Sequence, residues 1–296
     1  MNKNYSSKLK AFSLIELSIV ILIIGILVAG VTSSSRLITR MKVVTTQNLT
    51  RNAPVSSIKD LVVWYETSLD ESFDNAEESD GTPITSWFDL NPQSSFKVNS
   101  IQSTVDNKPK FKTNIFNGLP GILFDGSNDF LIASSVGISG KGLSIFIVAK
   151  RISFVSFQGL VSGVTSSQDQ EPGAFIGYLD FNNGMIYSGA LGTYWQSVSQ
   201  PNPADGSPFI YSTIFNGTTN TSYLNTSIGN PIAVNTTSTT FNIDKMSVGS
   251  RYFSGTGNQF FNGYVSEVII FNRGLNTEER LAINAYLSKK YAIKTS

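Results

Sequence analysis

An apolar segment near the start of the chain is the most regular feature of its hydropathy pattern. Residues 12–31 carry one charge, Glu16, and no proline. As a helix rising about 1.5 Å per residue, the segment is roughly 30 Å long, which is the thickness of a bilayer's hydrocarbon core. Apolar residues then recur at helical spacing from Leu37 until Pro54, which disfavours helix at the residue before it. The pattern predicts one transmembrane and assembly helix within residues 12–52.

From residue 53 to the end of the chain, the pattern changes to short apolar runs. The clearest run is 143–150, where both alternating faces are largely apolar, as in the interior of a two-layer sandwich. The segments between runs are rich in Gly, Asn, Ser and Pro, which is typical of antiparallel strands. The other expected strands are 61–65, a buried segment within 84–90, 118–131 as strand, turn and strand, 158–162, 174–179, 185–187, 209–215, 222–225, 231–234, 246–249 and 260–271.

The last element has the signature of a helix. Asn276 stands at the N-cap position and Glu279 follows three residues later, which is a capping-box pattern. The helical pattern continues to residue 291 and includes Lys289 and Lys290, cations suited to a helix C-terminus. The expected fold is therefore mainly β, with a long N-terminal helix and a short C-terminal helix.

An Asp-Gly pair between two apolar runs predicts a tight turn, because both residues tolerate positive φ. Asp125, Ser127 and Asp129 also alternate like the start of a calcium loop. However, Phe130 stands where that loop needs glycine, and Val136 where it needs a bidentate glutamate. A turn is the preferred interpretation. The acidic stretch 70–80 is likewise interpreted as a solvated loop rather than a metal site.

Composition excludes several classes of function. The chain has no His and no Cys, which removes imidazole and thiolate nucleophiles, Cys/His zinc sites and disulfides. The 22 Lys and Arg nearly balance the 21 Asp and Glu. Since no concentrated basic stretch is present, nucleic-acid binding is not expected. No cofactor is required by any motif.

Residues 10–18, Lys-Ala-Phe-Ser-Leu-Ile-Glu-Leu-Ser, resemble the prepilin processing site of type IV pilins and type II secretion pseudopilins. The resemblance implies that prepilin peptidase removes residues 1–11 after Ala11, and that the new Phe12 amine is methylated. It also implies that Glu16 pairs with the Phe12 amine of a neighbouring subunit. The family usually has glycine where this chain has Ala11.

An ordinary signal peptide is the alternative for the same stretch, because both begin with lysines and continue apolar. Cleavage would then follow the small residues Val28-Ala29-Gly30. The basic residues on the two sides of the helix are balanced, so they do not fix its orientation. A cytoplasmic leader and an extracytoplasmic C-terminal domain are what the pilin resemblance implies.

A second resemblance covers about residues 55–293. Trp64, the segment around Trp87, Phe124-Asp125-Gly126-Ser127 and the closing strand with Asn272-Arg273-Gly274-Leu275 are similar to bacterial laminin-G-like domains of the concanavalin A-like superfamily. The resemblance implies a jelly-roll sandwich of two antiparallel sheets over residues 53–296. Such folds host lectins, adhesion modules and glycosidases, so the fold does not select a function.

The preferred hypothesis is a structural, pilin-like subunit, either a minor pilin or a pseudopilin. Its expected location is the bacterial inner membrane, as a single-pass protein, and then a pilus or pseudopilus filament built from other pilin subunits. The alternative is an anchored adhesin module in which the sandwich binds a glycan or another surface ligand. Tyr194, Trp195 and Tyr252, in Gly- and Ser-rich stretches, are the candidate aromatic residues for stacking on sugar rings.

Enzymatic activity is not expected. A glycosidase needs two carboxylates roughly 5–10 Å apart across a sugar. Glu267 has no acid two residues away on its strand, and no nucleophile constellation is present. We therefore expect Glu267 to be a structural acid paired with Arg273 or Arg251.

Overall fold

The computed structural model describes residues 14–153, 157–166, 173–179, 186–190, 203–228, 232–233 and 240–295. The chain divides into two structural units, Met1–Thr45 and Thr46–Ser296. Most of the first helix therefore forms one unit, while its last turns belong to the second unit with the strands and the C-terminal helix.

The helix α1 runs without interruption over Leu14–Arg51. It ends where the sequence predicts, because Ala53 adopts an extended conformation (φ −65°, ψ 145°) before Pro54, which opens the short helix η1 (Pro54–Ser56). The sequence also predicts a membrane span over residues 12–31. Among the described residues, no helix is both long and apolar enough to cross a membrane.

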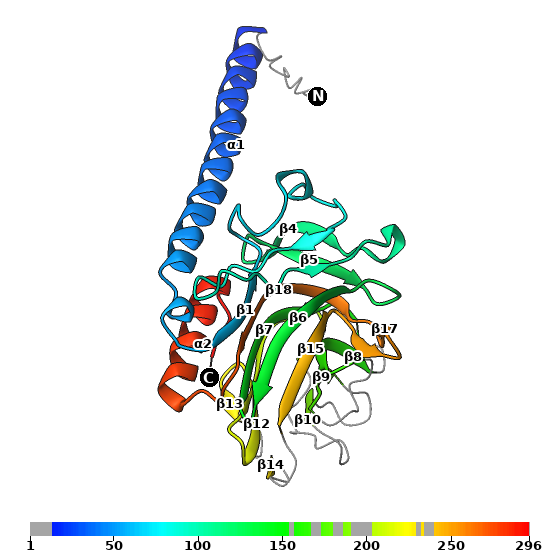
Figure 1. The fold of residues 1–296 in the computed structure, drawn as a ribbon. Helices are drawn as coiled ribbons and strands as arrows, with labels where there is room; N and C mark the ends of the chain where they lie inside the picture. The colour runs from blue at the N-terminus through cyan, green and yellow to red at the C-terminus, as the bar shows by residue number, and fades with distance from the viewer. Residues whose placement is uncertain are drawn as a thin grey trace, which may run out of the picture. The chain divides into compact units, whose positions relative to one another are not determined.

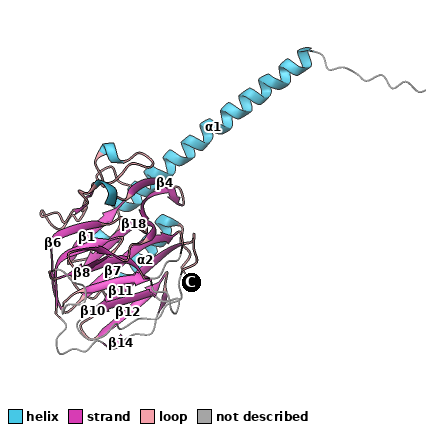
Figure 2. Cartoon of the chain, turned by 90° about the vertical axis from the view of Figure 1, so that its right-hand side faces the viewer, coloured by secondary structure: helices cyan, strands magenta, loops and turns pink. Residues whose placement is uncertain are grey.

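The second unit is a two-layer antiparallel sandwich, as predicted (Figures 1 and 2). A nine-stranded sheet has the order β13-β12-β11-β7-β18-β5-β4, with β1 paired to β18 and β14 paired to β12. A seven-stranded sheet has the order β10-β9-β8-β15-β6-β3-β2, and β16 and β17 form a separate hairpin. The strands of the nine-stranded sheet are β1 (Leu61–Glu66), β4 (Lys110–Phe116), β5 (Leu119–Asp125), β7 (Leu143–Arg151), β11 (Pro208–Phe215), β12 (Thr219–Leu224), β13 (Ser227–Ile228), β14 (Ile232–Ala233) and β18 (Asn262–Phe271).

The remaining elements lie in the other sheet, the hairpin and the connections. The seven-stranded sheet contains β2 (Ser86–Trp87), β3 (Ser100–Ile101), β6 (Leu131–Gly140), β8 (Gln158–Val164), β9 (Phe175–Leu179), β10 (Ile186–Ala190) and β15 (Phe241–Val248). The hairpin pairs β16 (Arg251–Phe253) with β17 (Thr256–Asn258). The short helices η2 (Asn75–Glu77) and η3 (Val105–Asn107) lie in loops, and α2 (Thr277–Tyr291) follows β18.

Several strand regions were not predicted from the sequence, namely β3, β4, most of β6, β13 and the β16–β17 hairpin. In the edge strand β4, buried Phe111 stands between exposed Lys110 and half-buried Lys112, and the pairing of β4 with β5 shifts register between Lys112 and Phe116. The β16–β17 hairpin turns through Ser254 and Gly255, both at positive φ. Each strand of this hairpin has only three residues. Short or irregular strands of this kind leave too few alternating positions for the pattern to be recognised.

The sandwich buries apolar side chains in two layers. The larger cluster lies between the sheets and includes Val63, Tyr65 and Trp87. A second cluster lies on the outer face of the nine-stranded sheet, where Trp64, Phe146 and Ile269 pack with apolar residues of α2. The strands β1, β7 and β18 are therefore apolar on both faces, which explains the near-continuous apolar run 143–150.

The predicted capping box starts α2. The Asn276 side chain accepts a hydrogen bond from the Glu279 backbone N–H (2.9 Å), and the Glu279 carboxylate accepts one from the Asn276 N–H (3.1 Å). Arg273 forms a bidentate ion pair with the same carboxylate (2.6 and 2.8 Å) and lies 3.4 Å from Asp60. The start of α2 is thereby fixed next to the end of β18.

The predicted turn after β5 is confirmed. Asp125 Oδ1 accepts backbone hydrogen bonds from Ser127 (2.8 Å) and Asn128 (3.2 Å), and Gly126 has a φ of 77°. Burial, followed by the nearby charge of Asp125, raises the pKa of Asp129 to about 7. Among the described residues, no group of three or more acidic side chains is placed to hold a metal ion.

Candidate functional site

Two acidic side chains face each other on the outer surface of the nine-stranded sheet. Along β1, Val63 and Tyr65 point into the core between the sheets, so alternation directs Trp64 and Glu66 to the opposite face. Glu66 pairs directly with Glu267 of β18. Like charges directly opposite on neighbouring strands are destabilising. This position therefore requires a compensating positive charge.

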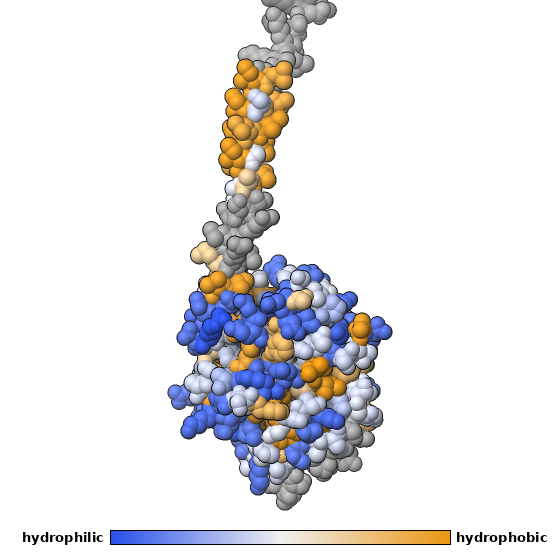
Figure 3. Space-filling model, turned by 45° about the horizontal axis from the view of Figure 1, so that its top comes forward, coloured by the Kyte–Doolittle hydropathy of each residue, from blue (hydrophilic) through white to orange (hydrophobic). Residues whose placement is uncertain are grey.

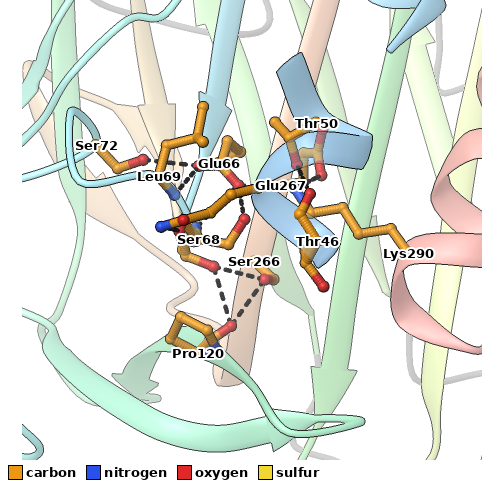
Figure 4. A network of polar contacts seen from close by, with 12 residues as sticks. Thr46, Thr50, Glu66, Ser68, Leu69, Ser72, Pro120, Ser266, Glu267 and Lys290 are labelled. Atoms are coloured by element: carbon orange, nitrogen blue, oxygen red, sulfur yellow. Dashed lines mark hydrogen bonds and ion pairs between the residues drawn. The ribbon is translucent and has the colours of Figure 1, made fainter. Parts of the chain in front are cut away.

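Lys290 of α2 supplies that charge (Figure 4). Its ammonium lies 2.7 Å from Glu66 Oε2 and 2.9 Å from Glu267 Oε2, and all three side chains are fully buried. The expected ion pair of Glu267 with Arg273 or Arg251 is therefore wrong. Arg273 is engaged with Glu279 and Asp60 at the start of α2, while Lys290 reaches Glu267 from the last turn of that helix.

The remaining carboxylate lone pairs are occupied by neutral donors. Glu267 accepts hydrogen bonds from Trp64 Nε1 (2.8 Å), Tyr286 OH (2.9 Å) and Tyr291 OH (2.7 Å). Glu66 accepts hydrogen bonds from residues of the loop after β1, namely the Ser68 N–H and hydroxyl, the Leu69 N–H and the Ser72 hydroxyl. We call Trp64, Glu66, Glu267, Tyr286, Lys290 and Tyr291 the buried charge network. Each carboxylate oxygen in it has at least two donors.

The electrostatics of the network favour the ionised state of Glu66 and of Lys290. Burial by itself raises the pKa of Glu66, but the charge and hydrogen bond of Lys290 and the Ser68 donors outweigh it, so the pKa lies below its ordinary value. Burial alone lowers the pKa of Lys290, whereas Glu267 and Glu66 raise it well above the ordinary value. Burial and the charge of Glu267 raise the pKa of Tyr286 and Tyr291, which remain protonated donors.

The network connects segments from both ends of the chain. Tyr286 OH also lies 3.5 Å from the hydroxyl of Thr50, a fully buried residue in the last turns of α1. Nearby, Gln47 donates hydrogen bonds to the Ser68 carbonyl and the Asp70 carboxylate, both at 3.0 Å. The end of α1, the loop after β1 and α2 are thus joined through polar contacts. The carboxylates are fully buried and each of their oxygens is hydrogen-bonded, so in this structure they hold α2 on the sheet.

This acid pair is not apparent from spacing along the strand of Glu267, because Glu66 lies opposite it on β1. A usable signal was present in α2, where Ile283, Tyr286, Leu287 and Lys290 recur at helical spacing and share one buried face. A lysine on an otherwise apolar face indicates a buried counter-charge.

The apolar part of α1 is the second notable feature. Its large apolar side chains between Leu14 and Val28 are 45–85% exposed. Six consecutive apolar residues, 19–24, cover every side of the helix, and the face shown in Figure 3 is correspondingly apolar. A helix that is apolar all round is normally buried, in protein or in lipid. The exposed side chains of this segment are therefore suited to contact with other apolar surfaces.

The structure describes only two of the six candidate residues. Glu16 lies in the first turn of α1 and is exposed. Ala11, Phe12, Tyr194 and Trp195 lie outside the described residues. Tyr252 on β16 is only 4% exposed, so its expected exposure on the surface is wrong. The hairpin packs against the seven-stranded sheet, where the Tyr252 N–H donates to the buried hydroxyl of Ser162 (2.7 Å).

Comparisons with solved structures identify the fold of the second unit. The binding domain of botulinum neurotoxin serotype D is 13% identical, with a TM-score of 0.53, covering 80% of this chain and 53% of that chain. Trypanosoma rangeli sialidase in complex with the inhibitor DANA is 13% identical, with a TM-score of 0.51. The match covers 83% of this chain and 38% of the sialidase chain. A third similar structure is domain 4 of AbnA, an extracellular GH43 arabinanase from Geobacillus stearothermophilus, in complex with arabinotriose. It is 13% identical, with a TM-score of 0.50, and the match covers 78% of this chain and 98% of that domain.

At these identities the similarity establishes the fold alone, which is a concanavalin A-like, laminin-G-like β-sandwich. The chain spans only about a quarter of the NanB sialidase chains that also match. No protein-family model matches the chain. No curated protein matches it either.

Proposed function

We propose that this chain is a pilin-like structural subunit that displays a β-sandwich outside the membrane. The observation that carries the proposal is α1, one continuous helix whose exposed segment is apolar on all sides. Such a surface favours association with lipid or with helices of other subunits. The proposed location is the bacterial inner membrane, followed by a pilus or pseudopilus filament.

The sequence at the start of α1 supports this proposal. Residues 10–18 resemble a prepilin processing site, so we propose cleavage after Ala11 by prepilin peptidase. Cleavage creates a terminal ammonium on Phe12. In a neighbouring subunit, that ammonium would stabilise Glu16, since an acidic side chain in apolar surroundings is costly without a counter-charge.

The junction within the second unit suits a displayed domain. The last turns of α1 bond to the loop after β1 and to α2, and α2 is held to the sheet by the buried charge network. These contacts fix the end of the helix on the sandwich. In the proposed filament, they keep the sandwich attached to the assembling helix.

The N-terminal residue of the protein isolated from membranes tests the proposal. We expect a mass that corresponds to a start at Phe12 with a methylated amine, measured by intact-mass spectrometry and N-terminal peptide sequencing. Retention of Met1 would contradict processing by prepilin peptidase. A start at Val31 would instead indicate an ordinary signal peptide and a secreted domain.

A second proposal is that the sandwich binds a glycan or another surface ligand. The comparisons support it more directly than the first proposal, because one similar structure is a domain in complex with arabinotriose. The aromatic candidates reduce to Tyr194 and Trp195, since Tyr252 is buried. The two proposals are compatible, because a filament subunit can carry a binding domain.

A glycan array tests this second proposal. The full-length protein in detergent is expected to bind a defined group of glycans, and Trp195→Ala should reduce that binding at least tenfold if the ring stacks on a sugar. Tyr252→Phe serves as the control, because a buried ring should leave binding unchanged. Absence of binding to every glycan on the array would contradict carbohydrate recognition.

A further inference from the structure

A second group of buried polar side chains lies under α2, separate from the buried charge network. Arg280 and Asn284 are four residues apart and so share one face of the helix. Arg280 stacks on the ring of Tyr223 in β12, with its central guanidinium carbon 4.0 Å from the ring centroid. On the β11 side, Tyr223 is paired with Ser212. Ser212 lies between Ile210 and Ile214, which pack with α2 in the outer apolar cluster.

These side chains are almost completely buried. Arg280 is 9% exposed, Asn284 is 1% exposed and Ser212 is fully buried. Among the described residues, no hydrogen-bond partner is found for Arg280 Nη1, for either side-chain atom of Asn284 or for Ser212 Oγ. Most buried polar groups in proteins have a partner. Four such atoms under one helix are therefore available to hydrogen-bond a small polar species.

The species that these side chains are suited to bind is negatively charged. A buried guanidinium normally has an acidic partner, because an isolated buried charge is costly. Glu279, the acid next to Arg280 in sequence, is already bound by both guanidinium nitrogens of Arg273. The guanidinium of Arg280 stacks on the Tyr223 ring, which holds the guanidinium plane in place. A fixed guanidinium is suited to binding an oxyanion.

We propose that the seam between α2 and β12 is a binding site for a small oxyanion, with a carboxylate as the best-matched group. Arg280 Nη1, Asn284 Nδ2 and Ser212 Oγ are the donors. The remaining acceptor, Asn284 Oδ1, is satisfied by a hydroxyl or a water molecule that accompanies the anion. Tyr223, which stacks on Arg280, is half-buried, so the seam lies close to solvent. The site does not depend on filament assembly or on glycan binding.

The site is tested with the full-length protein in detergent. Sodium acetate at 50 mM is compared with sodium chloride at equal ionic strength. Acetate should raise the melting temperature of the sandwich by about 3 °C or more, if the dissociation constant is about 1 mM. Saturation-transfer NMR on the acetate methyl protons should detect direct binding. Inorganic phosphate in place of acetate shows whether a tetrahedral oxyanion is accepted equally well.

Matched variants separate specific binding from a general salt effect. Arg280→Met and Asn284→Ala should each lose the acetate-dependent rise and the NMR signal. Lys289→Met removes an exposed cation from the same helix and should retain both. An equal rise in the wild type and in Arg280→Met, or no rise and no NMR signal in the wild type, would overturn the proposal. A response to phosphate alone would overturn the preference for a carboxylate.

Discussion

Replacing Lys290 by methionine is expected to destabilise the sandwich by about 3–5 kcal/mol, the usual cost of removing one partner of a buried ion pair. Methionine retains the length and apolar stem of lysine but leaves Glu66 and Glu267 facing each other without a counter-charge. For a domain of about this size, the loss corresponds to a decrease in melting temperature of roughly 10 °C. Thermal and urea unfolding of the full-length protein at pH 7 measure it.

The pH dependence of the variant provides a second measure. In the wild type, the lowered pKa of Glu66 means that its contribution to stability is present at neutral pH and is lost only as the pH falls through the folded-state pKa. In Lys290→Met, burial and the facing carboxylate raise the pKa of at least one glutamate above its unfolded value. The folded variant then binds more protons than the unfolded chain, so its stability should increase as the pH falls from 7 to 5.

Two controls distinguish the network from general effects of the substitution. Lys289→Met, at the exposed neighbouring position, should change the free energy of unfolding by less than about 0.5 kcal/mol. A triple variant, Glu66→Gln, Glu267→Gln and Lys290→Met, should recover much of the lost stability, because no uncompensated charge remains buried. If Lys290→Met is as stable as the wild type, the network does not hold α2 to the sheet.

Much of the fold follows from local features of the sequence. Pro54 ends α1 through its steric effect on Ala53, and Asn276 with Glu279 starts α2 through a capping box. The strand β7 is recognisable because both of its faces are buried, one between the sheets and one under α2. Each of these features depends on residues close together in the chain, so it can be recognised from the sequence alone.

The candidate site required information that local patterns do not hold. The pairing of Glu66 with Glu267 depends on β1 lying next to β18, which is set by the topology of the sheet. The role of Lys290 was hidden by its position near the end of α2, where a lysine commonly interacts with the helix dipole. The burial of Tyr252 depends on where a short hairpin packs. Each of these features joins segments far apart in the chain.

The proposed assembly through α1 makes Glu16→Ala the most informative change in the first unit. The variant should enter the membrane at least as well as the wild type, because an acidic residue in a membrane helix costs up to about 2.5–3.5 kcal/mol and alanine does not. Its incorporation into filaments should nevertheless decrease at least tenfold, because the Phe12 amine of a neighbouring subunit loses its counter-charge. Immunoblotting of membrane and sheared filament fractions measures the two quantities separately.

Leu14→Ala is the matched control, since Leu14 is an exposed apolar residue of the same helical region and carries no charge. This variant should insert, be processed and be incorporated at close to the wild-type level. Glu16→Asp keeps the charge on a shorter side chain and should restore part of the incorporation if an ion pair is responsible. If Glu16→Ala is incorporated as well as the wild type in cells that assemble filaments, α1 associates through its apolar surface without this ion pair.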